Sequence, residues 1–90
     1  MPEGFLGLDP EEMERVASRM DAEAQKLDQA IRQVTSQLRS TEWVGPDRTR
    51  FEKEWTSEHQ VSIRRTVDLL RTNARELKRH AKEQRAASGR

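Results

Sequence analysis

The side chains that could do chemistry in this chain are two histidines and a group of glutamates near the N-terminus. His59 and His80 are 21 residues apart in one predicted helix, which separates them by about 30 Å, too far to share a metal ion. Glu11, Glu12 and Glu14 fall in the first turn of another predicted helix, where solvated acids suit the positive end of the helix dipole. We interpret His59 as a seam residue with an exposed ring edge, the alternative being a metal or pH-sensing role.

Signatures of common enzyme sites are absent from the sequence. It contains no cysteine, which excludes disulfides, thiol catalysis and zinc sites of the cysteine type. It also has no glycine-rich phosphate loop, no Gly-x-Ser-x-Gly motif and no tyrosine. We therefore expect a non-enzymatic protein with no catalytic residue, no metal, no cofactor and no small-molecule substrate.

Charge is distributed unevenly along the chain. Residues 1–63 carry 8 basic and 13 acidic side chains, whereas residues 64–90 carry 9 basic and 3 acidic ones. A predicted basic ridge, mostly opposite the apolar side of the second helix, consists of Arg64, Arg71, Arg75, Lys78, Arg79, Lys82 and Arg85. The ridge is a solvated face, a surface for subunit pairing or an acidic partner, or a track for a phosphate backbone. Nucleic acid is the less favoured partner, because no aromatic residues are interleaved for base stacking.

Composition limits the fold to one small domain. In 90 residues, 37% are charged and 32% are apolar, so the core is thin and order depends on regular placement of the apolar residues. The N-terminus lacks the basic and apolar regions of a secretory signal, and no run of about 18 apolar residues occurs. By these ordinary rules we expect a soluble cytoplasmic protein without stable membrane insertion.

A first amphipathic helix is predicted over about 10–40. Asp9 and Glu12 have the spacing of a capping box, and Pro10 suits the first helical position. Apolar or small residues then recur in steps of three or four, which places them on one side of a helix. They are Met13, Val16, Met20, Ala24, Leu27, Ile31, Val34 and Leu38.

A second amphipathic helix is predicted over about 46–84, followed by a flexible tail at 85–90. Gly45 precedes a proline and is steered away from helical geometry, while Pro46 suits the first helical position. The apolar stripe of this helix consists of Phe51, Trp55, Ile63, Val67, Leu70, Ala74, Leu77 and Ala81, with His59 filling its one gap.

The turn at 41–45 is so short that the helices must be antiparallel neighbours, which predicts an all-α hairpin over 1–90. Two helices of about 45 Å leave apolar flanks exposed, so we expect the hairpin to pair with a second hairpin in a four-helix bundle. The predicted residues of the hairpin or dimer seam are Met13, Val16, Met20, Leu27, Ile31, Val34, Leu38, Phe51, Trp55, Ile63, Val67, Leu70 and Leu77.

The corner between the helices has a recognisable motif. Trp43-Val44-Gly45 lies centrally in a cysteine-free chain of this length, between two amphipathic helices, with Phe51 and Trp55 soon after. In these features, which cover nearly the whole chain, it resembles the WXG-motif family of small type VII (ESX) secretion substrates.

The resemblance implies a helical hairpin that forms a four-helix bundle as a homodimer or as a heterodimer with a sister protein. It also implies a protein that is cytoplasmic before export and leaves the cell folded, without a cleaved signal peptide, through a type VII secretion ATPase. Trp43 and Gly45 are then the turn motif and a candidate recognition surface for secretion. Alternatively, Trp43 only closes the end of the bundle while Gly45 lets the backbone turn.

One feature of the family pattern is missing. Family members carry a Tyr-x-x-x-Asp/Glu signal after the second helix, and the nearest counterpart here, His80 to Gln84, has neither the phenol nor the acid. We therefore expect a signal-bearing partner to carry this chain. The alternatives are a cytosolic helical adaptor that binds nucleic acid or an acidic protein through the basic ridge, and an effector that perturbs membranes outside the cell.

Overall fold

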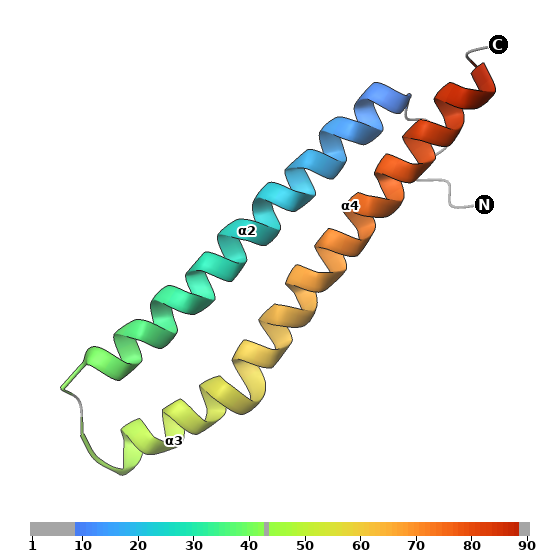
Figure 1. Ribbon diagram of the computed structural model, residues 1–90. Helices are drawn as coiled ribbons and strands as arrows, with labels where there is room; N and C mark the ends of the chain where they lie inside the picture. Colours follow the sequence, from blue (N-terminus) through green and yellow to red (C-terminus); the bar gives the residue numbers. More distant parts are fainter. Residues whose placement is uncertain (1–8, 43, 89–90) are drawn as a thin grey trace.

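The computed structural model describes residues 9–42 and 44–88. These residues form α2 (Pro10–Ser40), α3 (Pro46–Glu54), the π-helical turn η1 (Trp55–His59) and α4 (Gln60–Ser88). The two long helices α2 and α4 run side by side in opposite directions, and the corner joins them at one end of a rod measuring 66 × 22 × 15 Å (Figure 1). The all-α class and the helical hairpin are thus confirmed.

Helix α2 begins and ends where local chemistry favours it. The Glu12 backbone N–H donates to Asp9 Oδ1 at 2.8 Å, and the Asp9 N–H donates to Glu12 Oε1 at 3.5 Å, which completes the predicted capping box. At the other end, the Thr41 N–H and hydroxyl both donate to the carbonyl of Gln37, at 3.0 and 2.6 Å. The bounds of α2 coincide with the predicted helix over 10–40.

The corner turns at Gly45, which has φ +133° and ψ 179°. This backbone region is essentially accessible only to glycine, so the residue type is required by conformation rather than by crowding. The Gly45 carbonyl accepts from the Thr49 N–H at 3.2 Å, and Pro46 occupies the first position of α3. Trp43, the other predicted residue of the turn motif, lies outside the described residues.

The second predicted helix is interrupted near its start. In η1 the Gln60 N–H donates to the carbonyl of Trp55, an i to i+5 bond that inserts an extra residue into the turn. This insertion rotates the residues before it relative to those after it, so the predicted stripe does not continue as one line. In the single hairpin His59 is exposed, and Phe51 is 39% exposed.

The short helix α3 diverges from α2. None of its residues is buried, and it continues directly into η1, whereas α4 supplies the main packing against α2. In Figure 1 the chain bends between α3 and α4, so the hairpin is wider at its corner end.

Helix α4 is longer than expected. It continues to Ser88, whereas the sequence predicts a helix to about 84 and a flexible tail at 85–90. Arg85 is held by the carboxylate of Glu14 on α2, which extends the interhelical contact beyond the predicted end. Residues 89 and 90 lie outside the described part of the chain.

The core is a thin line between α2 and α4. Its buried residues are Met13, Ala17, Ala24, Ile31, Val67, Ala74, Leu77 and Ala81. Four of them are alanines with no exposed surface, which lets the two backbones approach closely. Ile31 and Leu77 are the largest fully buried side chains, so most of the packing free energy depends on few residues.

Candidate interaction surfaces

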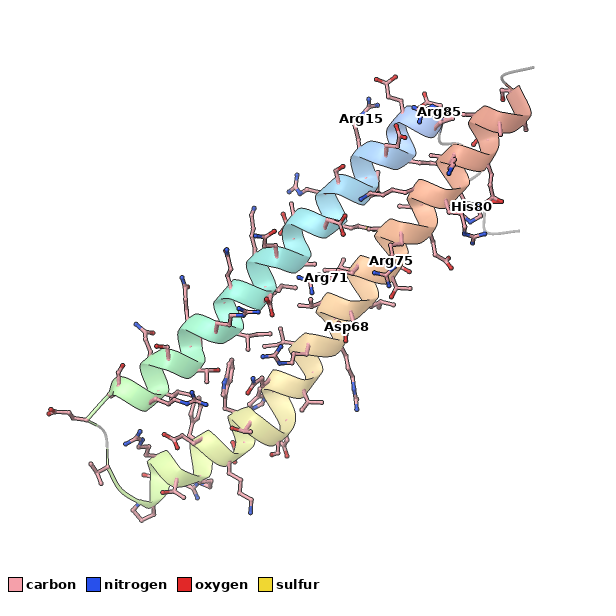
Figure 2. All side chains as sticks on the ribbon, in the orientation of Figure 1. Arg15, Asp68, Arg71, Arg75, His80 and Arg85 are labelled. Atoms are coloured by element: carbon pink, nitrogen blue, oxygen red, sulfur yellow. The ribbon has the colours of Figure 1, made fainter. Side chains whose placement is uncertain are left out.

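One long edge of the hairpin is closed by ion pairs between its two helices. Lys78 Nζ lies 2.9 Å from Asp21 Oδ2, Arg64 Nη1 lies 3.7 Å from Asp28 Oδ1, and Arg85 binds the carboxylate of Glu14. Figure 2 shows Arg85 reaching from α4 toward the first turns of α2. We call these three pairs the charge ladder.

The seven-residue spacing of its acids and bases explains the charge ladder. Its acids Glu14, Asp21 and Asp28 recur every seven residues, and its bases occupy positions of a matching series, 64, 78 and 85. A spacing of seven residues is close to two helical turns, so each series stays on one side of its helix. The sequence contains this signal, but it appears only when the two helices are aligned antiparallel.

Ion pairing changes the ionisation of the carboxylates at this end of the rod. The hydrogen bond from Arg85 lowers the pKa of the Glu14 carboxyl below its ordinary value, and the same contact raises the pKa of Arg85. The backbone N–H of Glu12 likewise lowers the pKa of Asp9. These acids therefore remain charged to lower pH in the folded chain than in the unfolded chain.

The predicted basic ridge is divided by the structure rather than presented on one outer face. Arg64, Lys78 and Arg85 flank the seam and belong to the charge ladder. Arg79 pairs with Glu76 and Glu83 on its own helix, at 3.9 and 3.5 Å. The three remaining members, Arg71, Arg75 and Lys82, form no ion pair within residues 9–42 and 44–88.

The opposite long edge of the hairpin has no such ladder. Counting about 100° per residue from the buried line, two rows of residues with heptad spacing lie on this side. The row on α2 consists of Val16, Met20, Glu23, Leu27, Ala30 and Val34, and the row on α4 consists of Thr66, Leu70, Asn73, His80 and Gln84. We call the surface formed by these two rows the open face.

The open face has few charged side chains, and some of its apolar side chains are partly exposed to solvent. Val16 and Val34 are 38% and 36% exposed, although both belong to the predicted seam. Leu69, which borders the row on α4, is 59% exposed. The one acid, Glu23, is engaged along α2 by Arg19 at 3.0 Å and Lys26 at 3.5 Å, and the Arg19 hydrogen bond lowers the pKa of Glu23. Charge is therefore concentrated at the margin of this face.

The structure distributes the thirteen predicted seam residues over three environments. Those buried between the helices are Met13, Ile31, Val67 and Leu77. The half-buried ones are Met20, Leu27, Leu38, Trp55, Ile63 and Leu70, and the exposed ones are Val16, Val34 and Phe51. Ala17, a fully buried residue that the predicted stripe omits, lies where its small side chain allows close helix contact. Its position four residues after Met13 is the signal that could have identified it.

The divergence of α3 leaves a hollow of about 240 Å³ near the corner, lined by Thr35, Leu38, Arg39, Glu52, Trp55, Thr56 and Gln60. Trp55 Nε1–H donates to Thr35 Oγ1 at 2.9 Å, and the Thr35 hydroxyl donates to the carbonyl of Ile31 at 2.7 Å. Arg48 spans the gap and donates from Nη2 to the carbonyl of Leu38 at 2.8 Å. Hydrogen bonds therefore connect the residues at the wider, corner end of the hairpin to α2.

A second, open hollow of about 570 Å³ adjoins the first, and the two share Thr35, Arg39 and Gln60. Its other lining residues are Arg32, Ser36, Ser40 and Arg64. It lies on the same edge as the charge ladder, between the ladder and the corner. We call it the arginine groove.

Residues 9–42 and 44–88 contain no group of three or more metal-ligating side chains. Within the same residues, no helix is long and apolar enough to cross a membrane. The arrangement provides surfaces for recognition: a charge-poor face, a corner and a basic groove. Comparisons with protein-family models, with curated proteins and with solved structures find no match for this chain.

Proposed function

We propose that this protein is a non-enzymatic substrate or partner protein of a type VII secretion system, which pairs through its open face with a second helical hairpin. The observation that carries the proposal is the open face itself, where heptad rows of largely uncharged residues remain partly exposed along the rod. A surface of this kind is typical of a helix bundle that lacks its other half.

The physical case for pairing rests on the imbalance between the length and the core of the hairpin. A rod 66 Å long depends on eight buried apolar residues, four of which are alanines. Laying a second hairpin over the open face would bury Val16, Leu27, Val34 and Leu70 more fully, at roughly 25 cal/mol per Å² of apolar surface removed from water. The hairpin therefore gains stability from a partner.

We infer that the partner is a different chain, which carries the export signal for both. His80 to Gln84, the counterpart of the family's tail signal, lies inside α4, and both end residues belong to the open face. In the proposed pair this segment serves packing, and the partner's tail contacts the secretion ATPase. The complex assembles in the cytoplasm and leaves the cell without a cleaved signal peptide.

In this proposal the corner has two tasks. Gly45 provides the left-handed backbone that the turn needs. Trp43 forms a composite recognition surface with the partner's tail.

Co-secretion with a candidate partner hairpin that carries the family's tail signal is the direct test. We expect both chains in the culture medium, and Trp43→Ala should abolish export of both while the pair still co-purifies from cells. Val44→Ala, which alters the neighbouring corner residue, is the matched control and should be exported normally. Continued export of an intact Trp43→Ala pair would show that the corner is structural only.

A cytosolic adaptor is the second candidate function. It is favoured by Arg71, Arg75 and Lys82, basic side chains on α4 without an ion pair in the described part of the chain. Such an adaptor would bind nucleic acid or an acidic protein, with affinity that falls steeply as salt rises. Pairing through the open face depends little on salt, so binding measured between about 50 and 200 mM salt separates the two candidates.

A further inference from the structure

The long edge of the hairpin that carries the charge ladder has two halves, which differ in charge. From the free end of the rod to Asp28, the acids of α2 pair with Arg85, Lys78 and Arg64 of α4. From residue 29 to residue 40, α2 contains no acid, while Arg32 and Arg39 continue along this edge. The charge ladder therefore ends at Asp28, and the arginine groove begins there.

The arginine groove has an uncompensated positive charge. Arg32, Arg39 and Arg64 supply three positive charges, and Asp28 supplies one negative charge that Arg32 and Arg64 share, at 3.1 and 3.7 Å. The local sum is +3 − 1 = +2. Arg39 forms no ion pair with any described residue. Asp28 orients two of the guanidinium groups without neutralising the groove.

The shape of the arginine groove suits an extended chain. Arg32 and Arg39 are seven residues apart on α2, which is about 10 Å along the helix axis. Arg64 contributes to the groove from α4, and Ser36 and Ser40 are further lining residues from α2. Thr35, which also lines the groove, accepts a hydrogen bond from Trp55 and donates one to the carbonyl of Ile31. These two hydrogen bonds fix the orientation of the Thr35 side chain.

We propose that the arginine groove binds an acidic segment of a partner protein, with two carboxylates about 10 Å apart on Arg32 and Arg39. In a polyproline II segment, which has three residues per turn and rises about 3.1 Å per residue, side chains three residues apart lie on the same side with about this separation. The planar guanidinium fork matches a carboxylate in bidentate geometry. The groove, at about 570 Å³, is much larger than a single phosphate ion. Its lining contains no aromatic platform for a nucleic-acid base.

This site is separate from the open face, because the two lie on opposite edges of the hairpin. A chain paired through its open face therefore keeps the arginine groove accessible. Acidic-segment binding does not depend on the proposed secretion function, and either can be correct without the other.

The test uses fluorescence anisotropy of a labelled twelve-residue peptide with aspartates three residues apart, and a matched peptide with asparagines in their place. The full chain should bind the aspartate peptide, and binding should weaken at least about tenfold in Arg39→Glu. Lys53→Glu, an exposed position on α3, makes the same change in net charge outside the groove and should retain binding. Arg39→Lys should show an intermediate loss, because it keeps the charge but loses the fork.

Several results would overturn the inference. One is no preference for the aspartate peptide. Another is an equal loss of binding in Lys53→Glu and Arg39→Glu, which would assign binding to the overall electrostatic field of the protein. Inorganic phosphate that binds as tightly as the peptide would indicate a site for one oxyanion, and an oligonucleotide that binds more tightly would indicate nucleic acid. Circular dichroism checks that each variant keeps its helices, and Arg39→Gln replaces Arg39→Glu if charge reversal unfolds the chain.

Discussion

The two long edges of the hairpin both border a narrow apolar seam, but different kinds of side chain cover the seam on each edge. On one edge, the charge ladder does so within the chain, through Glu14, Asp21 and Asp28 and their bases on α4. On the other edge, the open face carries apolar and uncharged polar side chains at heptad spacing, with Val16 and Val34 partly exposed. The charge ladder forms within one chain, and we propose that the open face needs a second chain.

Energetic arguments agree with this division. Exposed ion pairs contribute little to stability but disfavour wrong alignments, so the charge ladder fixes the antiparallel register of α2 and α4. Apolar rows gain free energy from any well-packed cover and therefore suit association. The charge ladder thus specifies the hairpin, and in the proposed pair the open face specifies the association with a second chain.

The largest effect is expected from the seam that both edges border. Leu77→Ala removes a side chain that is 1% exposed and should lower the free energy of unfolding by about 2–5 kcal/mol. Chemical denaturation followed by circular dichroism measures the change. Leu69→Ala, at a position that is 59% exposed, is the control and should change stability by less than about 0.5 kcal/mol. Equal effects of the two substitutions would contradict the assigned seam.

The next largest effect on stability is expected at the corner that joins the two helical arms of the hairpin. Gly45→Ala places a side chain on a backbone with φ +133°, which should destabilise the hairpin by roughly 1–3 kcal/mol. Apart from Gly45 and its two chain neighbours, no atom of the described residues lies within 4 Å of the added methyl group, so we assign the cost to backbone strain. Thermal unfolding provides the measurement, with Glu42→Ala as a control in the same turn. An unchanged midpoint would show that another backbone geometry serves the turn equally well.

A smaller effect is expected when charge is introduced on the open face. Val34→Glu should weaken pairing with the second hairpin about tenfold or more, because the new carboxylate would be buried against apolar rows. Val61→Glu is a matched control, since Val61 is 39% exposed and lies nine residues from Leu70, about half a turn around the helix. Sedimentation of the purified pair gives both affinities. If Val61→Glu weakens pairing as much as Val34→Glu, the pairing surface has been placed on the wrong edge.

The smallest effect concerns the charge ladder at acidic pH. The pKa of Glu14 is lowered by Arg85, so its stabilising charge is fully present above the ordinary glutamate range, near pH 4, and is lost as pH falls through the lowered value. Stability should therefore decline at acidic pH, and Glu14→Gln should remove part of that decline. Glu58→Gln, in the exposed turn η1, should leave the decline unchanged. Identical pH profiles for all three proteins would exclude a role of Glu14 in folding.

Much of the hairpin could be predicted because its signals are local. Asp9 and Glu12 identify the start of α2, Gly45 and Pro46 identify the corner, and the apolar spacing identifies two helices. The π-helical turn at 55–59 could not be predicted, because no residue type marks an i to i+5 bond. For the same reason, the exposed positions of His59 and Phe51 in the single hairpin could not be predicted.

The division of the surface was harder to foresee, because it depends on the register between the helices. Arg64, Lys78 and Arg85 look like part of one basic ridge when α4 is considered alone. They become members of a charge ladder only when Glu14, Asp21 and Asp28 are brought opposite them. The apolar stripes likewise predict a seam, but which members face α4 and which remain open depends on where the second helix lies.

The claim that the open face is covered in the cell can be tested by thiol labelling, since the natural chain has no cysteine. Val34→Cys and Val61→Cys introduce one thiol each, at positions with nearly equal exposure in the single hairpin, 36% and 39%. A membrane-permeant maleimide applied to intact cells should label the thiol at 61 rapidly and the thiol at 34 at least about tenfold more slowly. Equal labelling rates, with the helical content of both variants unchanged, would contradict pairing through the open face.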